Sequence, residues 1–157
     1  MNVARSVRGS PMLMPCTLSK TGWLAEQPAE FQERMVALGH WRTFRAGRNL
    51  YEFGDGSNGV FGLETGLADI AIPISDDEMV TLHRAGPGLW AGDSALFADV
   101  PRIASVTAHT DSLVFVIPAQ ALKQHIAERH AELLYFYKLT HRNFQPALSA
   151  LEEDNAL

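Results

Sequence analysis

The chain has 157 residues, of which 46% are hydrophobic and 20% are charged, and its formal net charge is −5. This length and composition are typical of one compact soluble domain with a single core. Because phosphate contacts require a basic face, the acidic balance argues against a chain that binds nucleic acid by itself.

The single cysteine, Cys16, excludes an internal disulfide framework, a cysteine-based zinc site and a cysteine-ligated iron–sulfur cluster. No run approaches the roughly 20 apolar residues that a membrane helix needs. Two prolines interrupt the apolar stretch "PMLMPCTL", which makes it a poor signal-peptide core. We therefore expect a cytoplasmic protein.

The first elements in chain order are a lead-in and a helix. Residues 1–17 hold two arginines, no acidic residue and no periodic pattern, which predicts a flexible N-terminal segment. Residues 28–38, "PAEFQERMVAL", place a proline at a first-turn position and apolar residues at spacings of four and three. This pattern predicts a helix over 28–38.

Residues 41–117 are a series of short apolar or alternating runs, separated by turn residues at intervals of about 8 to 12, which is typical of an all-β sandwich or barrel. The predicted strands are "NLYEF", "VFGLE", "LADIAIPI", "MVTLH", "IASVTA" and "SLVFVI". Alternation in the third run predicts a strand covered on one side, with Ala68, Ile70, Ile72 and Ile74 on the covered face.

Two helices are predicted after Pro118, over 118–130 and 131–154, and Pro146 should kink the second. The second helix carries an apolar stripe, which is either core or a dimer seam; it comprises Leu133, Phe136 or Tyr137, Thr140, Phe144, Leu148 and Leu151. The predicted organisation is a flexible segment over 1–17, a helix plus β-roll domain over 18–130, and a C-terminal dimer or hinge helix over 131–157.

The stretch "GLWAGDSALFADVPRIASVTA" at 88–108 carries the candidate site. Gly92 permits a tight turn, Asp93 or Ser94 can cap, and the next three residues form one helical turn. The N–H groups of a helix start favour an anion, and Arg102 directed at the same point adds a charge-assisted contact. The helix start and Arg102 together are therefore suited to bind a phosphate.

These residues resemble the phosphate-binding cassette of cyclic-nucleotide-binding domains, which reads Gly-Glu-Leu-Ala-Leu, a spacer, then Pro-Arg-small-Ala-Thr/Ser-Val. The cassette here is Gly92-Asp93-Ser94-Ala95-Leu96, "FADV", then Pro101-Arg102-Ile103-Ala104-Ser105-Val106. "LYEFGDGSNGVFGLETGLADI" and "AGPGLWAGD" resemble further family segments, so the likeness spans about residues 18–145. With a long final helix, the chain looks most like the effector domain of Crp/Fnr-type transcription regulators.

The resemblance implies a mainly β fold with flanking helices, a double-stranded β-helix or jelly roll, and a long C-terminal helix. It implies a cyclic nucleotide, cAMP or cGMP, as effector, a homodimer through the last helix, and no metal. Arg102 pairs with the cyclic phosphate, Asp93 replaces a glutamate that holds the ribose, and Ser149 falls where base contacts arise. The implied ligand-binding residues are Gly92, Asp93, Ser94, Arg102, Ile103 and Ser105. The resemblance also implies that DNA is bound only through a domain not present in this chain.

Several alternatives remain open at this stage. Asp93 fits equally well as a plain N-cap, and its short side chain together with Ile103 leaves open the alternative of a degenerate domain that dimerises without nucleotide. In that case a neighbouring Asp or Glu satisfies Arg102. A metal-dependent cupin enzyme is less favoured, because the six histidines are scattered without an H-x-H pair. A haem or gas sensor is a further alternative, but the sequence offers no pair of residues that would identify a haem or gas site.

Overall fold

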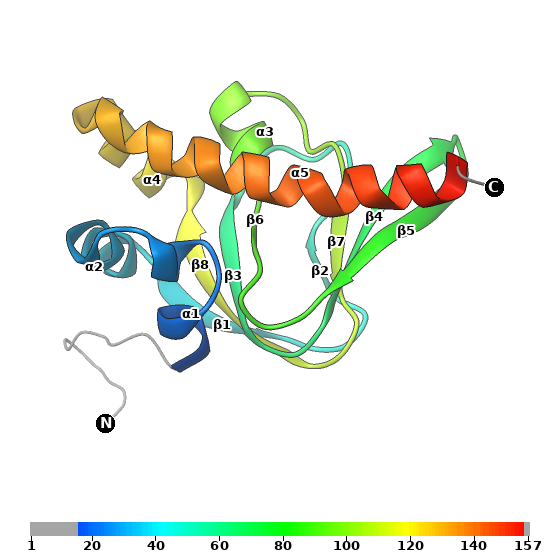
Figure 1. Ribbon diagram of the computed structural model, residues 1–157, viewed down its shortest axis with the longest axis horizontal. Coiled ribbons are helices and arrows are strands. Elements are labelled where there is room, and N and C mark those ends of the chain that lie inside the picture. The colour runs from blue at the N-terminus through cyan, green and yellow to red at the C-terminus, as the bar shows by residue number, and fades with distance from the viewer. Residues whose placement is uncertain (1–15, 156–157) are drawn as a thin grey trace.

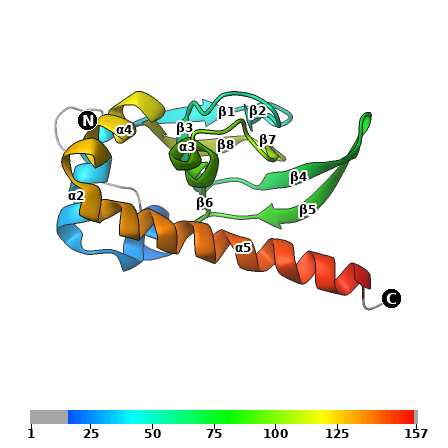
Figure 2. The ribbon, with the colours of Figure 1, turned by 90° about the horizontal axis from the view of Figure 1, so that it is seen from above.

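The computed structural model describes residues 16–155, in which two antiparallel sheets form a roll that helices cover at one end and along one side (Figures 1 and 2). The helices are α1 (Cys16–Lys20), η2 (Leu24–Glu26), α2 (Ala29–Leu38), α3 (Asp93–Ala98), α4 (Ala119–Glu128), η3 (His130–Glu132) and α5 (Leu133–Asn155). The strands are β1 (His40–Phe44), β2 (Asn49–Tyr51), β3 (Gly59–Thr65), β4 (Ala68–Ser75), β5 (Glu78–Ala85), β6 (Trp90–Ala91), β7 (Ser105–Ala108) and β8 (Ser112–Pro118). None of the helices in this range is long and apolar enough to cross a membrane.

The strand orders are β1-β8-β3-β6 in one sheet and β2-β7-β4-β5 in the other. Apart from the hairpin of β4 and β5, neighbouring strands are not consecutive in the chain, as β1 with β8 and β2 with β7, and all the pairs are antiparallel. The expected jelly roll with flanking helices is therefore confirmed. The helices predicted over 28–38 and 118–130 are also confirmed, as α2 and α4.

The alternation predicted for β4 is wrong in its second half. Ala68 is buried, whereas Ile74 at the other end of the same predicted face is 61% exposed. The pairing of β4 with β5 shifts register between Ile70 and Ala71 and again between Pro73 and Ser75. Because each shift inserts an irregularity into the two-residue repeat, the strand no longer presents one continuous face to the core. The tip of this hairpin extends beyond the roll (Figure 2).

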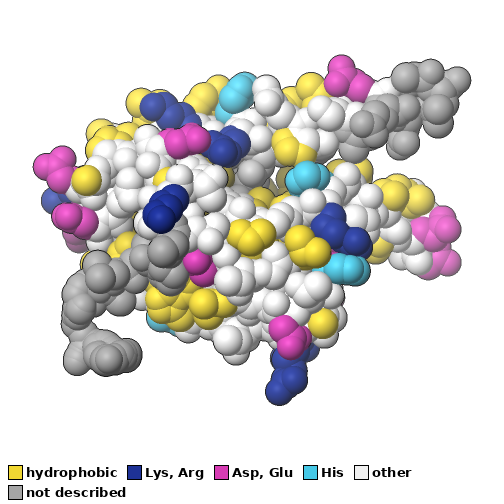
Figure 3. Space-filling view, turned by 60° about the horizontal axis from the view of Figure 1, so that its bottom comes forward, with side chains coloured by type: hydrophobic (Ala, Val, Ile, Leu, Met, Phe, Trp, Pro, Cys, Tyr) yellow, Lys and Arg dark blue, Asp and Glu magenta, His cyan; other side chains and the backbone are white. Residues whose placement is uncertain are grey.

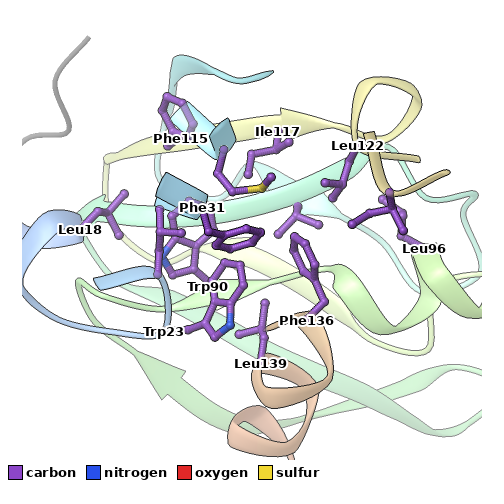
Figure 4. Packing of buried hydrophobic residues seen from close by; sticks show 14 residues of the cluster. Leu18, Trp23, Phe31, Trp90, Leu96, Phe115, Ile117, Leu122, Phe136 and Leu139 are labelled. Carbon is purple, nitrogen blue, oxygen red and sulfur yellow. The ribbon is translucent and has the colours of Figure 1, made fainter. Parts of the chain in front are cut away.

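The main core lies where the N-terminal helices, α4 and the first half of α5 meet β3, β6 and β8 (Figure 4). Trp23 packs edge-on against Trp90, with ring centroids 5.7 Å apart, and its indole Nε1 donates to the carbonyl of Tyr135 at 2.6 Å. Phe136 packs on the same indole at 5.0 Å. These contacts attach the start of α5 to the helices at the N-terminal end.

Helix α5 continues through Pro146 as one element, without the sharp kink expected there (Figure 1). The proline therefore removes one backbone hydrogen bond from α5 but does not interrupt the helix. Among the stripe residues whose side chains the structure describes, only Phe136 is buried, and it shares the core with Leu139. The exposed stripe residues are Leu133 (42%), Tyr137 (69%), Thr140, Phe144 (59%) and Leu148 (43%). The side chain of Leu151 and residues 1–15 of the expected flexible segment lie outside the described part of the chain.

Candidate functional site

Arg102 lies in the connection between α3 and β7 and is 2% exposed. Its backbone N–H donates to the carbonyl of Asp55 at 2.8 Å, and its own carbonyl accepts from the N–H of Gly54 at 2.8 Å. The loop between β2 and β3 therefore fixes the backbone of Arg102 from both sides. This loop is the "GDGSNG" segment, for which the sequence predicted only a turn.

The guanidinium of Arg102 is oriented by acceptors of the protein itself. Nη1 donates to the carbonyl of Gly92 at 2.6 Å, and Nη2 donates to the carbonyl of Gly59 at 2.6 Å and to Oδ1 of Asn58 at 3.0 Å. A guanidinium has five N–H donors, so these bonds leave donors to spare. Nε is buried and has no hydrogen-bond partner among the described residues.

Tyr51 of β2 covers the guanidinium, with 3.8 Å between the guanidinium carbon of Arg102 and the centre of the tyrosine ring. Burial raises the pKa of the Tyr51 hydroxyl to about 12, although the charge of Arg102 opposes this shift. Burial also lowers the pKa of Arg102, against the opposing effects of Tyr51 and Asp93. The site therefore holds a cation in surroundings that disfavour charge.

Gly92 allows the guanidinium to approach the backbone. It precedes α3 with a φ of 107°, in the left-handed region that side chains rarely adopt. A Cβ atom at this position would lie 2.7 Å from the carbonyl oxygen of Gly59 and 3.2 Å from Nη1 of Arg102. Gly92 is also the N-cap residue of α3, which corrects the expectation that Asp93 or Ser94 takes that position.

Asp93 is the first residue of α3 and is 3% exposed. Its carboxylate accepts a hydrogen bond from the hydroxyl of Thr140, which is 47 residues away on α5. Burial raises the pKa of Asp93; the Thr140 hydroxyl, the backbone N–H groups of Asp93 and Ser94, and the charge of Arg102 reduce this shift. A carboxylate at the start of the cassette is thus in direct contact with the long helix.

The other predicted site residues lie at the edge of this cluster. Ser94 is exposed, and Ile103 is 64% exposed. The hydroxyl of Ser105 accepts from the N–H of Phe53 at 2.8 Å and so links β7 to the end of β2. Ser149 is exposed on α5. The structure thus brings Gly92, Asp93 and Arg102 together, and adds Tyr51, Asn58, Gly59 and Thr140, which the sequence did not predict as site residues.

A hollow of about 220 Å³ borders Asp93 between α3 and α5. Its walls are mostly apolar, and its lining residues are Asp93, Ser94, Phe97, Leu133, Phe136, Tyr137 and Thr140. Within residues 16–155 no cluster of His, Cys, Asp or Glu is placed to hold a metal ion. On the face shown in Figure 3, the lysine and arginine side chains are scattered and form no continuous basic patch.

Residues 41–129 match the family described as "Cyclic nucleotide-binding domain". No curated protein sequence matches.

Solved structures share the fold at low identity. The catabolite activator protein of Thermus thermophilus is 17% identical with a TM-score of 0.69, over 85% of this chain and 62% of that chain. The c-di-GMP-responsive regulator CLP of Xanthomonas campestris is 20% identical with a TM-score of 0.65, over 82% and 63%. The regulatory domain of Toxoplasma gondii PKA with cAMP is 18% identical with a TM-score of 0.63, over 74% and 48%.

The present chain spans less than two thirds of the length of each of these three structures. The family match covers more than half of the chain and contains Gly92, Asp93 and Arg102, which the fold brings together beside the N-terminus of α3. The chain belongs to the cyclic nucleotide-binding domain family.

Proposed function

We propose that this domain binds a cyclic nucleotide, cAMP or cGMP, as the effector of a Crp/Fnr-type transcription regulator. The observation that carries the proposal is the buried Nε of Arg102, which has no hydrogen-bond partner among the described residues. Three other donor bonds fix the plane of the guanidinium, so the free N–H has a defined direction. A phosphate oxygen is a suitable acceptor for it.

The electrostatics of Arg102 favour the same ligand. Within the described residues its partners are carbonyl groups, an amide oxygen and an aromatic ring, and no carboxylate forms an ion pair with it. A buried cation without a counter-ion is costly, and an anion that approaches Nε reduces this cost. The charge of Asp93 raises the pKa of Arg102, but no hydrogen bond or salt bridge joins the two side chains among the described contacts, so a neighbouring Asp or Glu does not pair directly with Arg102.

Each predicted site residue has a role in the proposal. Arg102 binds the cyclic phosphate, Gly92 permits the close approach, and the backbone N–H groups of Ser94 and Ile103 add donors. Asp93 accepts a hydrogen bond from a sugar hydroxyl. Ser105 acts indirectly, because its hydroxyl holds the β2–β3 loop that orients the guanidinium. The domain acts by binding and conformational change and catalyses no reaction.

The partners follow from the same proposal. The exposed stripe on α5, with Tyr137 at 69% and Phe144 at 59% exposure, supports a homodimer through this helix. DNA is contacted by a further domain outside this chain, and the protein is cytoplasmic.

Calorimetric titration of cAMP and cGMP into the wild type and Arg102→Lys tests the nucleotide site. Lysine keeps the charge but cannot reproduce the fork of donors, so we expect about ten- to a hundredfold weaker binding. Arg48→Ala, which removes a charge on an exposed turn, serves as the control and should bind as the wild type does. Circular dichroism confirms that each variant is folded. Absence of binding to the wild type at millimolar nucleotide would contradict the proposal.

A second candidate function is a ligand-free dimerisation module. Two observations favour it. Arg102 is 2% exposed and donates to backbone carbonyls, and the carboxylate of Asp93 accepts a hydrogen bond from Thr140, so both side chains already have partners within the protein. Dimers in sedimentation experiments, combined with no calorimetric signal from either nucleotide, would support this candidate over the first.

A further inference from the structure

Helix α5 is hydrogen-bonded to both ends of the four-residue segment that leads into the cassette, Trp90–Asp93. The Asn143 amide donates to the carbonyl of Trp90 at 2.7 Å, and the Thr140 hydroxyl donates to the carboxylate of Asp93. Thr140 and Asn143 are three positions apart and therefore lie on the same side of the helix. One turn of α5 thus holds this whole segment.

The same segment is bonded to Arg102. The carbonyl of Gly92 accepts from Nη1 at 2.6 Å, and the next residue is Asp93, whose side chain contacts α5. Adjacent residues of one backbone therefore link the guanidinium to the helix. A change in the position of either group is transmitted through the peptide between Gly92 and Asp93.

Access to the Asp93 carboxylate requires a displacement. The residue is 3% exposed, and Thr140 covers it from the side of the hollow between α3 and α5. Asp93 lines this hollow but exposes only 3% of its surface, so a ligand hydroxyl meets the Thr140 hydroxyl as it approaches Oδ2 of the carboxylate. The hydroxyl of Thr140 already donates a hydrogen bond to this carboxylate.

We propose that Thr140 is the positioning residue that couples the ligand to α5: a ligand hydroxyl takes the Asp93 carboxylate from Thr140 and so loosens this turn of the helix. The inference rests on the proposed nucleotide site. Thr140 and the ligand then compete for one acceptor, and by linkage whatever weakens the Thr140 contact strengthens ligand binding.

The experiment compares Thr140→Val with Thr140→Ser. Valine has nearly the shape of threonine but no hydroxyl, whereas serine keeps the donor. Affinity for cAMP and cGMP is measured by calorimetry, and hydrogen exchange of the α5 amides is measured with and without nucleotide. Arg142→Ala serves as the structural control, because Arg142 binds Glu26 at 2.7 Å on the same helix without contacting Asp93.

We expect Thr140→Val to bind nucleotide about three- to tenfold more tightly than Thr140→Ser, the equivalent of one hydrogen bond. Without ligand, the α5 amides of Thr140→Val should exchange faster, at a rate that the wild type reaches only with nucleotide. Arg142→Ala should leave the affinity unchanged, which separates coupling from a general loosening of α5.

The inference is overturned, and the proposed function retained, when the wild type binds but Thr140→Val matches Thr140→Ser in affinity or in ligand-free exchange. Binding to Thr140→Val alone, with none to the wild type, overturns both the proposed function and the inference, because the ligand then does not displace Thr140 in the natural protein. If no form of the protein binds nucleotide, both the inference and the proposed function are wrong.

Discussion

The guanidinium of Arg102 is stacked on the ring of Tyr51 at 3.8 Å, in the interior of the roll. Tyr51 also packs on Phe61, with ring centroids 5.8 Å apart. The tyrosine therefore connects the cation to the second cluster of buried apolar residues, which includes Phe61 and Val106. Its ring does two things: it contributes apolar burial, and its face stabilises the charge of Arg102.

Tyr51→Leu should lower the free energy of unfolding by about 1–3 kcal/mol, because leucine keeps part of the burial but loses the cation–π contact. Tyr51→Phe retains the ring and serves as the matched control, with stability close to that of the wild type. Urea denaturation measures both. Equal stability of the leucine and phenylalanine variants would contradict the stacking argument.

Gly92→Ala should lower the free energy of unfolding by more than about 1 kcal/mol, because a side chain is strained at its φ of 107° and meets the carbonyl of Gly59. It should also weaken nucleotide binding, since the new Cβ displaces the guanidinium of Arg102. Gly56→Ala is the control, because a Cβ there has no heavy atom within 4 Å and no positive φ. Denaturation and calorimetry check the two effects, and equal behaviour of the two variants would refute the steric argument.

Much of the fold could be predicted because local patterns determine it. Alternation and turn residues identified six of the strands, whereas β1 and β6 were missed for physical reasons. His40, Arg42 and Thr43 of β1 are exposed and polar, and its two apolar residues, Trp41 and Phe44, are three positions apart, so the strand shows no alternation to detect. Strand β6 has only two residues. The pairing of β1 with β8 and of β6 with β3 is a tertiary effect that overrides weak local propensity.

The candidate site was predictable only where it is continuous in sequence. Gly92, Asp93 and Arg102 lie within one cassette, so their spacing identified them. Asn58 and Thr140 reach the same cluster across 44 and 47 residues of chain. Contacts of this kind depend on how the sheets and α5 pack, so they cannot be predicted from the spacing of residues along the chain.

Asp93→Asn should change the pH dependence of stability. Burial raises the pKa of Asp93 above its ordinary value of 3.8, so its stabilising contribution is present below that pH and is lost as the pH rises through the folded-state pKa. The free energy of unfolding of the wild type minus that of the asparagine variant should therefore fall as the pH rises above 3.8. Asp76→Asn, at the exposed hairpin turn, is the control. A difference that rises with pH would show that burial is not the largest effect on the pKa of Asp93.

Phe144→Asp should prevent dimerisation through α5. Phe144 is 59% exposed on the apolar stripe, and a carboxylate there leaves a charge unpaired in the proposed seam. Gln145→Asp adds the same charge at the next, also exposed, position and should remain dimeric. Sedimentation velocity measures the oligomeric state of both. A monomeric wild type would exclude the seam at the concentration tested.

Glu132→Gln should destabilise the junction between α4 and α5 at neutral pH. Glu132 is 6% exposed and accepts hydrogen bonds from His125 Nε2 at 2.6 Å and from Arg34 Nε at 2.7 Å. Burial alone would raise the pKa of Glu132, but the hydrogen bonds and charges of His125 and Arg34 outweigh burial and lower it. Removing the charge should reduce the free energy of unfolding by about 1–3 kcal/mol at pH 7.

The effect of Glu132→Gln should depend on pH with the opposite sign to that of Asp93→Asn. A lowered pKa means that the stabilisation is present above the ordinary value of 4.5 and is lost as the pH falls through the folded-state value. The difference between the wild type and the glutamine variant should therefore shrink on acidification below pH 4.5, as urea denaturation at a series of pH values can measure. Glu128→Gln, at an exposed position that ends α4, removes the same charge and should show neither the loss at pH 7 nor this trend. If both variants behave alike, the buried contacts of Glu132 do not stabilise the junction, and α5 is held to the roll by its apolar packing and by the bonds to Trp90 and Asp93.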